Sequence, residues 1–228
     1  MMIAAAPKPE PQQLARLAIE HVYEEGEWLT HYGDIWPYLF IVEEGEIKAV
    51  KESLEGRSLI VTNIYPGEIF WGLAFFNENT PMWIGLQANQ LSRIRVWAHD
   101  DLVPILRQNG NVMWDMTRSL VQRMQRASDI VEELAFQPVT GRLANLLLDH
   151  FEDDVGEAVA RDLTLDEMAA YIGSTREMVC RQLYRFANMG VIQINRTEFM
   201  ILNATRLRSL SIVGKGGEHL AELPVKAS

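Results

Sequence analysis

The chain has 228 residues, of which 48% are hydrophobic, so it is long enough to form two small domains with cores of their own. Its formal net charge of −10 argues against a protein that holds nucleic acid by a basic surface spread over the whole chain. The single cysteine excludes a disulfide framework within the chain and fits a reducing cytoplasm, and no apolar run approaches the length of a membrane span.

The N-terminal segment is rich in alanine and proline. Residues 1–6 are apolar and are followed by Pro7-Lys8-Pro9-Glu10-Pro11, without the charged-then-apolar layout of a signal peptide. We therefore expect a flexible tail over residues 1–13, and a second tail over residues 213–228.

Residues 14–110 have the pattern of a β domain. Short strand-like runs cover residues 38–42, 58–65 and 93–97, and turn sequences such as Pro66-Gly67-Glu68 separate them. Arg93, Ile94, Arg95 and Val96 alternate as a half-buried strand should. Many short strands with glycine and proline turns predict a jelly-roll-like barrel.

Five aromatic residues lie close together between the second and third of these runs. They can line an apolar ligand pocket, but aromatic residues at this density more often fill a core, and we favour core filling. The five are Phe70, Trp71, Phe75, Phe76 and Trp83.

The residues that usually carry catalysis or bind metals are not grouped. The five histidines are scattered without metal-ligand spacing, and an iron–sulfur cluster needs about four thiolates where this chain has one. Nucleophile-elbow, phosphate-loop and dinucleotide motifs are missing from the sequence. We therefore predict no enzyme activity, no cofactor and no metal, with a single histidine as a haem ligand left as an open alternative.

Residues 111–136 are predicted to form one long helix. Its apolar positions are spaced alternately four and three residues apart over three heptads, which favours a two-stranded coiled coil and hence a homodimer. The alternative is a helix that packs on its own domain, but Arg118, Arg123, Arg126 and Glu132 leave the other faces charged. The predicted seam consists of Met113, Thr117, Leu120, Met124, Ala127, Val131 and Leu134.

A helix-turn-helix follows within residues 137–212. Thr164 and Glu167 have the spacing of a capping box, Gly173 suits a tight turn, and Ser174 with Glu177 repeats the capping-box spacing. Helix, short glycine turn and helix form the helix-turn-helix unit. The apolar runs 191–194 and 199–202 then predict a β-hairpin, so the unit is winged.

The second helix of this unit carries the chemistry of base recognition. A guanidinium such as that of Arg176 or Arg181 can bond both acceptors of guanine, and the Glu177 carboxylate can accept from the cytosine amino group. Simpler roles are helix capping for Glu177 and a solvated charged face for the arginines. Residues 164–212 hold six Lys and Arg against four Asp and Glu, so the basic excess is confined to this region. The whole pattern indicates DNA binding.

Cys180 lies inside this helix. Its simpler interpretation is a small residue that faces the groove or the helix packing. The alternative is a redox-sensitive thiol whose oxidation blocks DNA docking, with the nearby arginines favouring the thiolate.

The segment Gly173–Leu183 resembles the recognition motif of the Crp/Fnr family of bacterial transcription regulators. Residues 134–136 and 139–142 resemble the family's hinge, and the glycines and Pro-Gly-Glu turn of the β domain resemble its cyclic-nucleotide-binding β-roll. The resemblance spans about Glu24 to Leu210. It implies an α+β fold: a β-roll over 14–110, a dimerisation helix over 111–136 and a winged helix-turn-helix over 137–212.

The resemblance also implies function. A homodimer in the cytoplasm would bind a pseudo-palindromic operator with a core like GTGA and would contact RNA polymerase, for which the acidic segment 152–154 is a poorly matching candidate. Arg176, Glu177 and Arg181 stand at the base-reading positions and Thr175 at a phosphate-contacting one. The remaining expected DNA-binding residues are Ser174, Thr140 and Arg196.

The effector chemistry of cyclic-AMP-binding relatives is missing. Gly72 stands at the position of the ribose-binding glutamate, Met82-Trp83 at that of the Arg-Ser pair, and Ala127-Ser128 at that of a Thr-Ser pair. A buried phosphate without its counter-charge is severely unfavourable, so usual cyclic nucleotide binding is not expected. The alternative is a sensor whose barrel binds another small molecule, or a cyclic nucleotide in a different mode. Candidate pocket residues are Trp71, Gly72, Leu73, Met82, Trp83 and Ser128.

Overall fold

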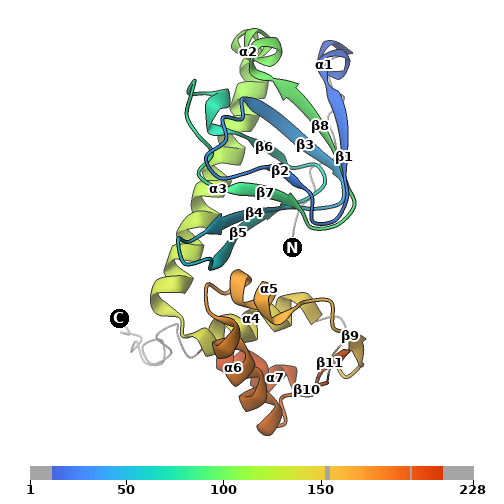
Figure 1. Cartoon of the computed structure of the whole chain (residues 1–228), viewed down its shortest axis with the longest axis vertical. Coiled ribbons are helices and arrows are strands. Elements are labelled where there is room, and N and C mark those ends of the chain that lie inside the picture. The colour runs from blue at the N-terminus through green and yellow to red at the C-terminus, as the bar shows by residue number, and fades with distance from the viewer. Residues whose placement is uncertain (1–11, 152–154, 196, 213–228) are drawn as a thin grey trace, which may run out of the picture. The chain divides into compact units, whose positions relative to one another are not determined.

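The computed structural model describes residues 12–151, 155–195 and 197–212. The chain divides into two compact units, one comprising residues up to Gly56 with Ile60–Ala127, the other Arg57–Leu59 with the residues from Ser128 on (Figure 1). Helix α1 (Gln12–Leu17) begins at residue 12, two residues inside the expected tail, and its Leu14 and Leu17 pack against an apolar cluster of the first unit that contains Trp97. The rest of that tail and the expected tail over 213–228 lie outside the described residues.

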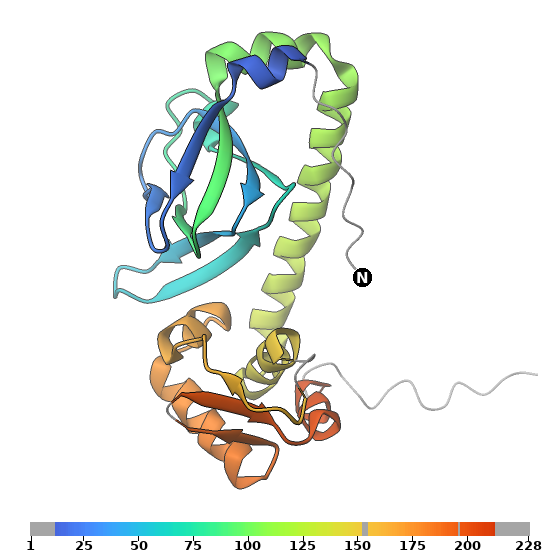
Figure 2. The same cartoon turned by 90° about the vertical axis from the view of Figure 1, so that its right-hand side faces the viewer.

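The first unit is built on two four-stranded sheets, as the jelly-roll prediction requires (Figures 1 and 2). Within each sheet the strands pair antiparallel, for example β3 with β8 in one sheet and β4 with β7 in the other. One sheet has the order β1 (Ile19–Tyr23), β8 (Ser92–Ala98), β3 (Tyr38–Glu44) and β6 (Ile69–Trp71). The other has the order β2 (Trp28–Thr30), β7 (Gly85–Ala88), β4 (Ile47–Glu52) and β5 (Ser58–Ile64).

Alternation along β8 separates the core from the surface, as predicted. Ile94 and Val96 are buried, whereas Arg93 and Arg95 pair with acidic side chains of β3. Side chains from both sheets, among them Phe40 and Leu86, form one apolar cluster. A second cluster gathers Phe75 from the short helix η1 (Leu73–Phe75), Leu102 from α2 (His99–Gln108) and Met116 from the long helix. Each large apolar side chain removed from water contributes about 1.5–3 kcal/mol.

The long helix α3 (Gly110–Phe136) matches the expected helix over 111–136 to within one residue. Asn109 precedes it, and its side-chain oxygen accepts from the backbone N–H of Val112 at 3.3 Å, as a helix cap does. The residues of α3 up to Ala127 belong to the first unit and those from Ser128 on to the second.

Besides the end of α3, the described part of the second unit contains four helices and a small sheet. The strands have the order β10 (Ile192–Ile194), β11 (Glu198–Ile201) and β9 (Val159–Ala160), which confirms the predicted hairpin and adds β9. A strand of two residues is too short to leave a periodic signal in the sequence. The helices are α4 (Val139–Phe151), α5 (Leu165–Tyr171), α6 (Arg176–Asn188) and α7 (Ala204–Ile212).

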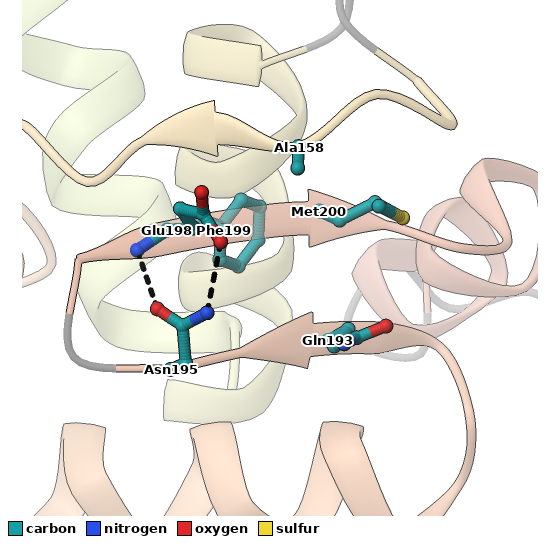
Figure 3. Close-up of a pocket in the computed structure, with 6 residues that line it drawn as sticks. All are labelled: Ala158, Gln193, Asn195, Glu198, Phe199 and Met200. Carbon is teal, nitrogen blue, oxygen red and sulfur yellow. Dashed lines mark hydrogen bonds between the residues drawn. The ribbon is translucent and has the colours of Figure 1, made fainter.

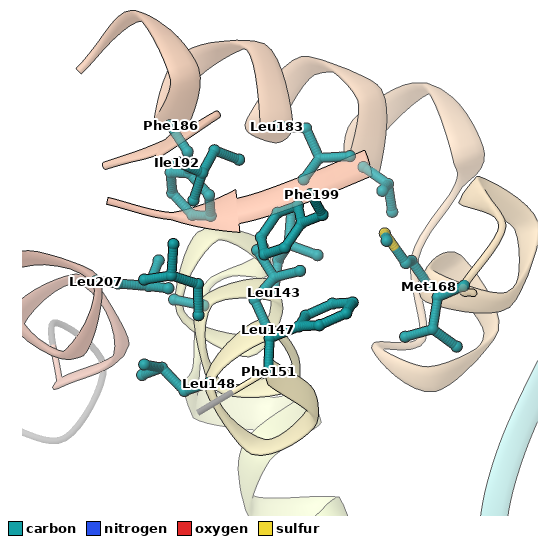
Figure 4. Packing of buried hydrophobic residues seen from close by; sticks show 14 of the residues in the cluster. Leu143, Leu147, Leu148, Phe151, Met168, Leu183, Phe186, Ile192, Phe199 and Leu207 are labelled. Atoms are coloured by element: carbon teal, nitrogen blue, oxygen red, sulfur yellow. The ribbon is translucent and has the colours of Figure 1, made fainter. Parts of the chain in front are cut away.

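One apolar core holds the second unit together (Figure 4). Leu143 and Leu147 of α4 are spaced by one helical turn and are fully buried, and they meet Phe186 of α6, Phe199 of β11 and Leu207 of α7. Since α6 contributes Phe186 to this core, its opposite face is left to solvent.

Candidate nucleic-acid interface

The first helix of the helix-turn-helix starts at the predicted capping box. The hydroxyl of Thr164 accepts from the backbone N–H of Glu167 at 3.2 Å, and the Glu167 carboxylate accepts from the backbone N–H of Thr164 at 2.9 Å. Two donors that the helix start leaves unpaired are thereby satisfied. The prediction made from these two residues is confirmed.

The predicted capping box of Ser174 and Glu177 is wrong. Thr175 caps α6, with its hydroxyl accepting from the backbone N–H of Met178 at 3.3 Å. The helix therefore starts one residue later, and Glu177 stands at its second position, from which the reciprocal bond is not formed. Ser174 instead donates its backbone N–H to Ala169 at 2.9 Å, closing the turn at Gly173, whose φ is +58°.

The exposed face of α6 brings together all three expected base-reading residues. Arg176, Glu177 and Arg181 are exposed, while Val179 and Phe186 on the other face are 0% exposed. An amphipathic helix with one anchored face holds the polar side chains of its other face at defined positions. Three further exposed residues lie on this face: Tyr184, Arg185 and Asn188. Their helical spacing from Arg181 could have identified them from the sequence.

Arg176 has a partner that the sequence reasoning missed. Its Nη1 atom donates to Oδ2 of Asp166 on α5 at 2.7 Å, with the two side chains 63% and 67% exposed. An exposed ion pair of this kind is worth about 0–1 kcal/mol. The pair therefore orients the guanidinium weakly and leaves it available to a stronger acceptor.

The remaining DNA-binding candidates lie in different settings. Thr140, at the start of α4, donates its hydroxyl to the side-chain oxygen of the buried Gln182 at 2.9 Å, so this hydroxyl links α4 to α6. The Thr175 hydroxyl is occupied in capping, and Ser174 is half-buried in the turn. Arg196 lies outside the described residues, as does the acidic segment 152–154.

Asn195 organises the turn of the wing (Figure 3). Its side chain accepts from the backbone N–H of Glu198 at 2.7 Å and donates to the carboxylate of the same residue at 3.0 Å. Beside these bonds lies a shallow hollow with room for a water molecule rather than an effector. Its lining is Ala158, Gln193, Asn195, Glu198, Phe199 and Met200.

Two candidate effector residues of the barrel are built into its packing. A Cβ atom at Gly72 would lie 2.0 Å from the backbone oxygen of Trp36, so a glutamate cannot stand here without moving the chain. Met82 is 2% exposed and belongs to the apolar cluster between the sheets. Of the others, Trp71 and Leu73 are half-buried and Ser128 is exposed on α3.

The expectation that Trp83 fills the core is wrong. Trp83 is 47% exposed, and the Lys51 amine lies 5.9 Å from its ring centroid. Its neighbour Met82 is the residue of this pair that is buried in the apolar cluster. Core filling holds for Phe70 and Phe75, which are buried, but Phe76 is 51% exposed.

Arg123 does not belong to a solvated helix face, contrary to the sequence-based interpretation. Its guanidinium lies 4.7 Å from the ring centroid of Phe70 and 4.8 Å from that of Trp71. Burial lowers the pKa of Arg123 to about 10, against the opposing effect of Glu68, so it remains a cation at neutral pH. The Glu68 carboxylate also accepts from Arg126 at 3.2 Å.

The predicted coiled-coil seam is uncovered in the single chain. Leu120 is 47% exposed, Met124 67% and Val131 66%, whereas Met116, which borders the seam, is 5% exposed and packs within the first unit. Trp114 and Val121, each one residue beyond a seam position, are exposed too. The other seam residues are likewise exposed: Met113, Thr117, Ala127 and Leu134.

Within the ranges that the structure describes, no group of three or more His, Cys, Asp or Glu is placed to hold a metal ion. Among those same residues, no helix has the length and apolar character needed to cross a bilayer.

Comparisons with known proteins match both units. Residues 20–109 match the model of the cyclic nucleotide-binding domain, and residues 141–210 match that of the Crp-like helix-turn-helix domain. A CRP-like cAMP-activated global transcriptional regulator of Mycobacterium tuberculosis is 26% identical over 208 residues, which cover 87% of this chain and 92% of that protein. The cyclic AMP receptor protein of Thermus thermophilus is 22% identical over 204 residues, covering 89% and 93%.

Solved structures share the fold. A Crp/Fnr-family regulator from Eubacterium rectale aligns with a TM-score of 0.75 at 18% identity, covering 88% of this chain and 92% of that one. The c-di-GMP-responsive regulator CLP of Xanthomonas campestris aligns with a TM-score of 0.73 at 17% identity, covering 84% and 97%. With a cyclic-nucleotide-binding-like β-roll followed by a Crp-like winged helix-turn-helix, the chain belongs to the Crp/Fnr family of transcription regulators.

Proposed function

We propose that the protein binds a pseudo-palindromic operator sequence-specifically as a homodimer. The observation that carries this proposal is the face of α6, which presents Arg176, Glu177 and Arg181 to solvent from a helix that is capped by Thr175 and anchored by Phe186. Two guanidiniums and a carboxylate on one helical face suit the donors and acceptors of guanine and cytosine in the major groove.

The homodimer is supported by the uncovered seam of α3. Apolar residues such as Leu120 and Met124 repeat at coiled-coil spacing and have no cover in the single chain. Two copies joined along this helix would present two recognition helices to two half-sites. Action in the cytoplasm and contact with RNA polymerase complete the proposed role.

Selection of duplexes from a random pool tests the proposal. We expect the bound sequences to converge on two inverted half-sites whose centres lie about one helical turn apart, with guanines at the positions read by the arginines. Affinity for the selected site should fall steeply with salt, since phosphate contacts release counterions. A pool that shows no enrichment after several rounds would contradict sequence-specific binding.

We also propose that DNA binding does not require cyclic AMP, although the relatives from M. tuberculosis and T. thermophilus are named for it. Gly72 leaves no room for the carboxylate that would hold the ribose hydroxyl, and the buried Met82 offers no charge to a phosphate. An anion placed against Met82 would be desolvated without a counter-charge, which is severely unfavourable.

Titration calorimetry with cyclic AMP and cyclic GMP is expected to show no binding at micromolar concentration. Operator affinity measured with and without each nucleotide should change by less than about tenfold, equivalent to about 1.4 kcal/mol of coupling. Lysozyme titrated in the same buffer controls for heats of dilution. Micromolar heats, or a larger change in operator affinity, would show that other residues have taken over the nucleotide site.

One observation favours a second function, that of a ligand-switched sensor. Arg123 places a guanidinium against Phe70 and Trp71, where an anionic ligand of another shape would find both a charge and aromatic faces. The structural neighbour CLP is named as c-di-GMP-responsive. Cyclic di-GMP as a third titrant separates the two functions: heats with this ligand alone, together with altered operator affinity, would identify a sensor.

A further inference from the structure

Arg142 binds backbone oxygens at the ends of two different helices. Its Nη1 atom donates to the carbonyl of Gln137, just after α3, at 2.6 Å. Its Nε atom donates to the carbonyl of Ile172, at the end of α5, at 2.8 Å. Longer contacts of 3.5 Å reach the carbonyls of Glu133, Leu134 and Gly173.

These carbonyls need a partner from outside their helices. The last carbonyls of an α-helix find no N–H donor within the helix itself. They also form the negative end of the helix dipole. A planar guanidinium has five N–H donors in a rigid fork, so one arginine can serve both helix ends at once. Burial lowers the pKa of Arg142, while the nearby Glu133 carboxylate opposes the shift.

A second contact joins the same two places. Gly173, in the turn between α5 and α6, has a φ of +58°, and a Cβ atom built on it would lie 2.7 Å from Cδ2 of Leu134. The turn therefore lies directly against the last turn of α3. Nearby, the side-chain oxygen of the buried Gln137 accepts from the Asn145 amide at 3.2 Å, which adds a polar link from the end of α3 to α4.

We propose that Arg142 is a positioning residue that fixes the direction of the recognition helix α6 relative to the end of α3. The proposal rests on the proposed function, since it concerns how two recognition helices are held for two half-sites. If α3 forms the dimer axis, the bonds of Arg142 set the separation of the two α6 helices. Arg142 would then govern the preferred half-site spacing and leave base preference within each half-site to α6.

The first experiment measures this directly, without DNA. Spin labels at Asp129→Cys on α3 and Asn188→Cys on α6, in a Cys180→Ser background of the full chain, report the distance between the two helices. Labelled protein is mixed with excess unlabelled protein, so that each dimer carries one labelled subunit. We expect a narrow distance distribution with Arg142 present and a broadened or shifted one in Arg142→Gln. Arg206→Gln is the matched control, because Arg206 donates to a single carbonyl, that of Met189, in the same unit.

The second experiment measures binding to the selected operator and to the same site with one base pair added between the half-sites. We expect the unmodified protein to lose about tenfold or more on the longer site, a difference of about 1.4 kcal/mol. Arg142→Gln should bind both sites within about threefold of each other, and keep its base preference at each half-site position. Arg142→Lys keeps the charge but not the forked guanidinium, so its loss of affinity on the longer site should lie between those of the unmodified protein and Arg142→Gln. If Arg142→Gln does not fold, the result for Arg142→Lys decides the question.

The outcomes separate this inference from the proposed function. Unchanged distance distributions and unchanged spacing preference in a folded Arg142 variant overturn the positioning role. Broadened distances in a protein that shows no sequence preference uphold the positioning role and overturn the proposed function. Loss of base preference together with spacing preference would assign Arg142 to general folding of the unit, and would also overturn the inference.

Discussion

Replacement of Leu120 by glutamate is expected to abolish the dimer and to lower operator affinity by more than about 100-fold, or about 2.7 kcal/mol. Leu120 lies at the middle of the exposed seam of α3, so in a dimer each new carboxylate would be buried near its counterpart. Burial of unpaired like charges costs several kcal/mol. A monomer then holds only one half-site and loses the gain from binding two sites at once, which amounts to about 10²–10⁴-fold.

Sedimentation velocity and operator binding at matched protein concentrations check this result. Gln122→Glu is the control, since it adds the same charge at an exposed position of α3 outside the seam. It should leave both the dimer and operator affinity unchanged within about twofold, since surface charge changes are worth a few tenths of a kcal/mol. An unmodified protein that sediments as a monomer at micromolar concentration would contradict the homodimer itself.

Replacement of Arg176 by alanine is expected to cost about 1–3 kcal/mol at each half-site, and therefore up to about 6 kcal/mol for the dimer on a symmetric operator. The reason is the loss of two donors to one guanine in each half-site, with nothing on the shortened side chain to replace them. The loss should be confined to one base-pair position of each half-site. The Arg176→Ala variant should bind the selected operator and operators altered at that position with equal affinity. Affinities for a panel of single-position operator changes measure it.

Two comparisons make this prediction specific. Asp166→Asn removes the ion-pair partner of Arg176 while keeping the arginine, and it should leave affinity unchanged or raise it by at most about fivefold at each half-site, because an exposed pair is worth about 0–1 kcal/mol. If Arg176→Ala instead weakens binding to the operator and to random DNA equally, the arginine contacts only phosphate. In that case the base-reading assignment of Arg176 is wrong.

Local signals in the sequence were sufficient for α5 and α6 of the helix-turn-helix and for the barrel strands β3, β5 and β8. The Thr164–Glu167 cap depends on residues three apart, and the exposed face of α6 depends on a period of 3.6. Even here the predicted cap of α6, Ser174, is one residue before the observed cap, Thr175, because both residue types are good helix caps. The choice between them is made by the turn at Gly173, in which the backbone N–H of Ser174 is taken by Ala169.

By itself, the sequence determined the order of the β-roll, the long helix and the winged helix-turn-helix, the family, and the residues that share the exposed face of α6, because each of these depends on neighbours within a turn or two of the chain or on a contiguous motif. Only the tertiary structure decided the roles of Arg123, Arg142 and Trp83. Arg142 meets Ile172 across 30 residues, and Arg126 on the same helix as Arg123 meets Glu68 across 58. A charged residue on a helix has the same local pattern whether it faces solvent, an aromatic pair or the end of another helix. The difference is made by which distant segment packs against it, and periodicity carries no information about that.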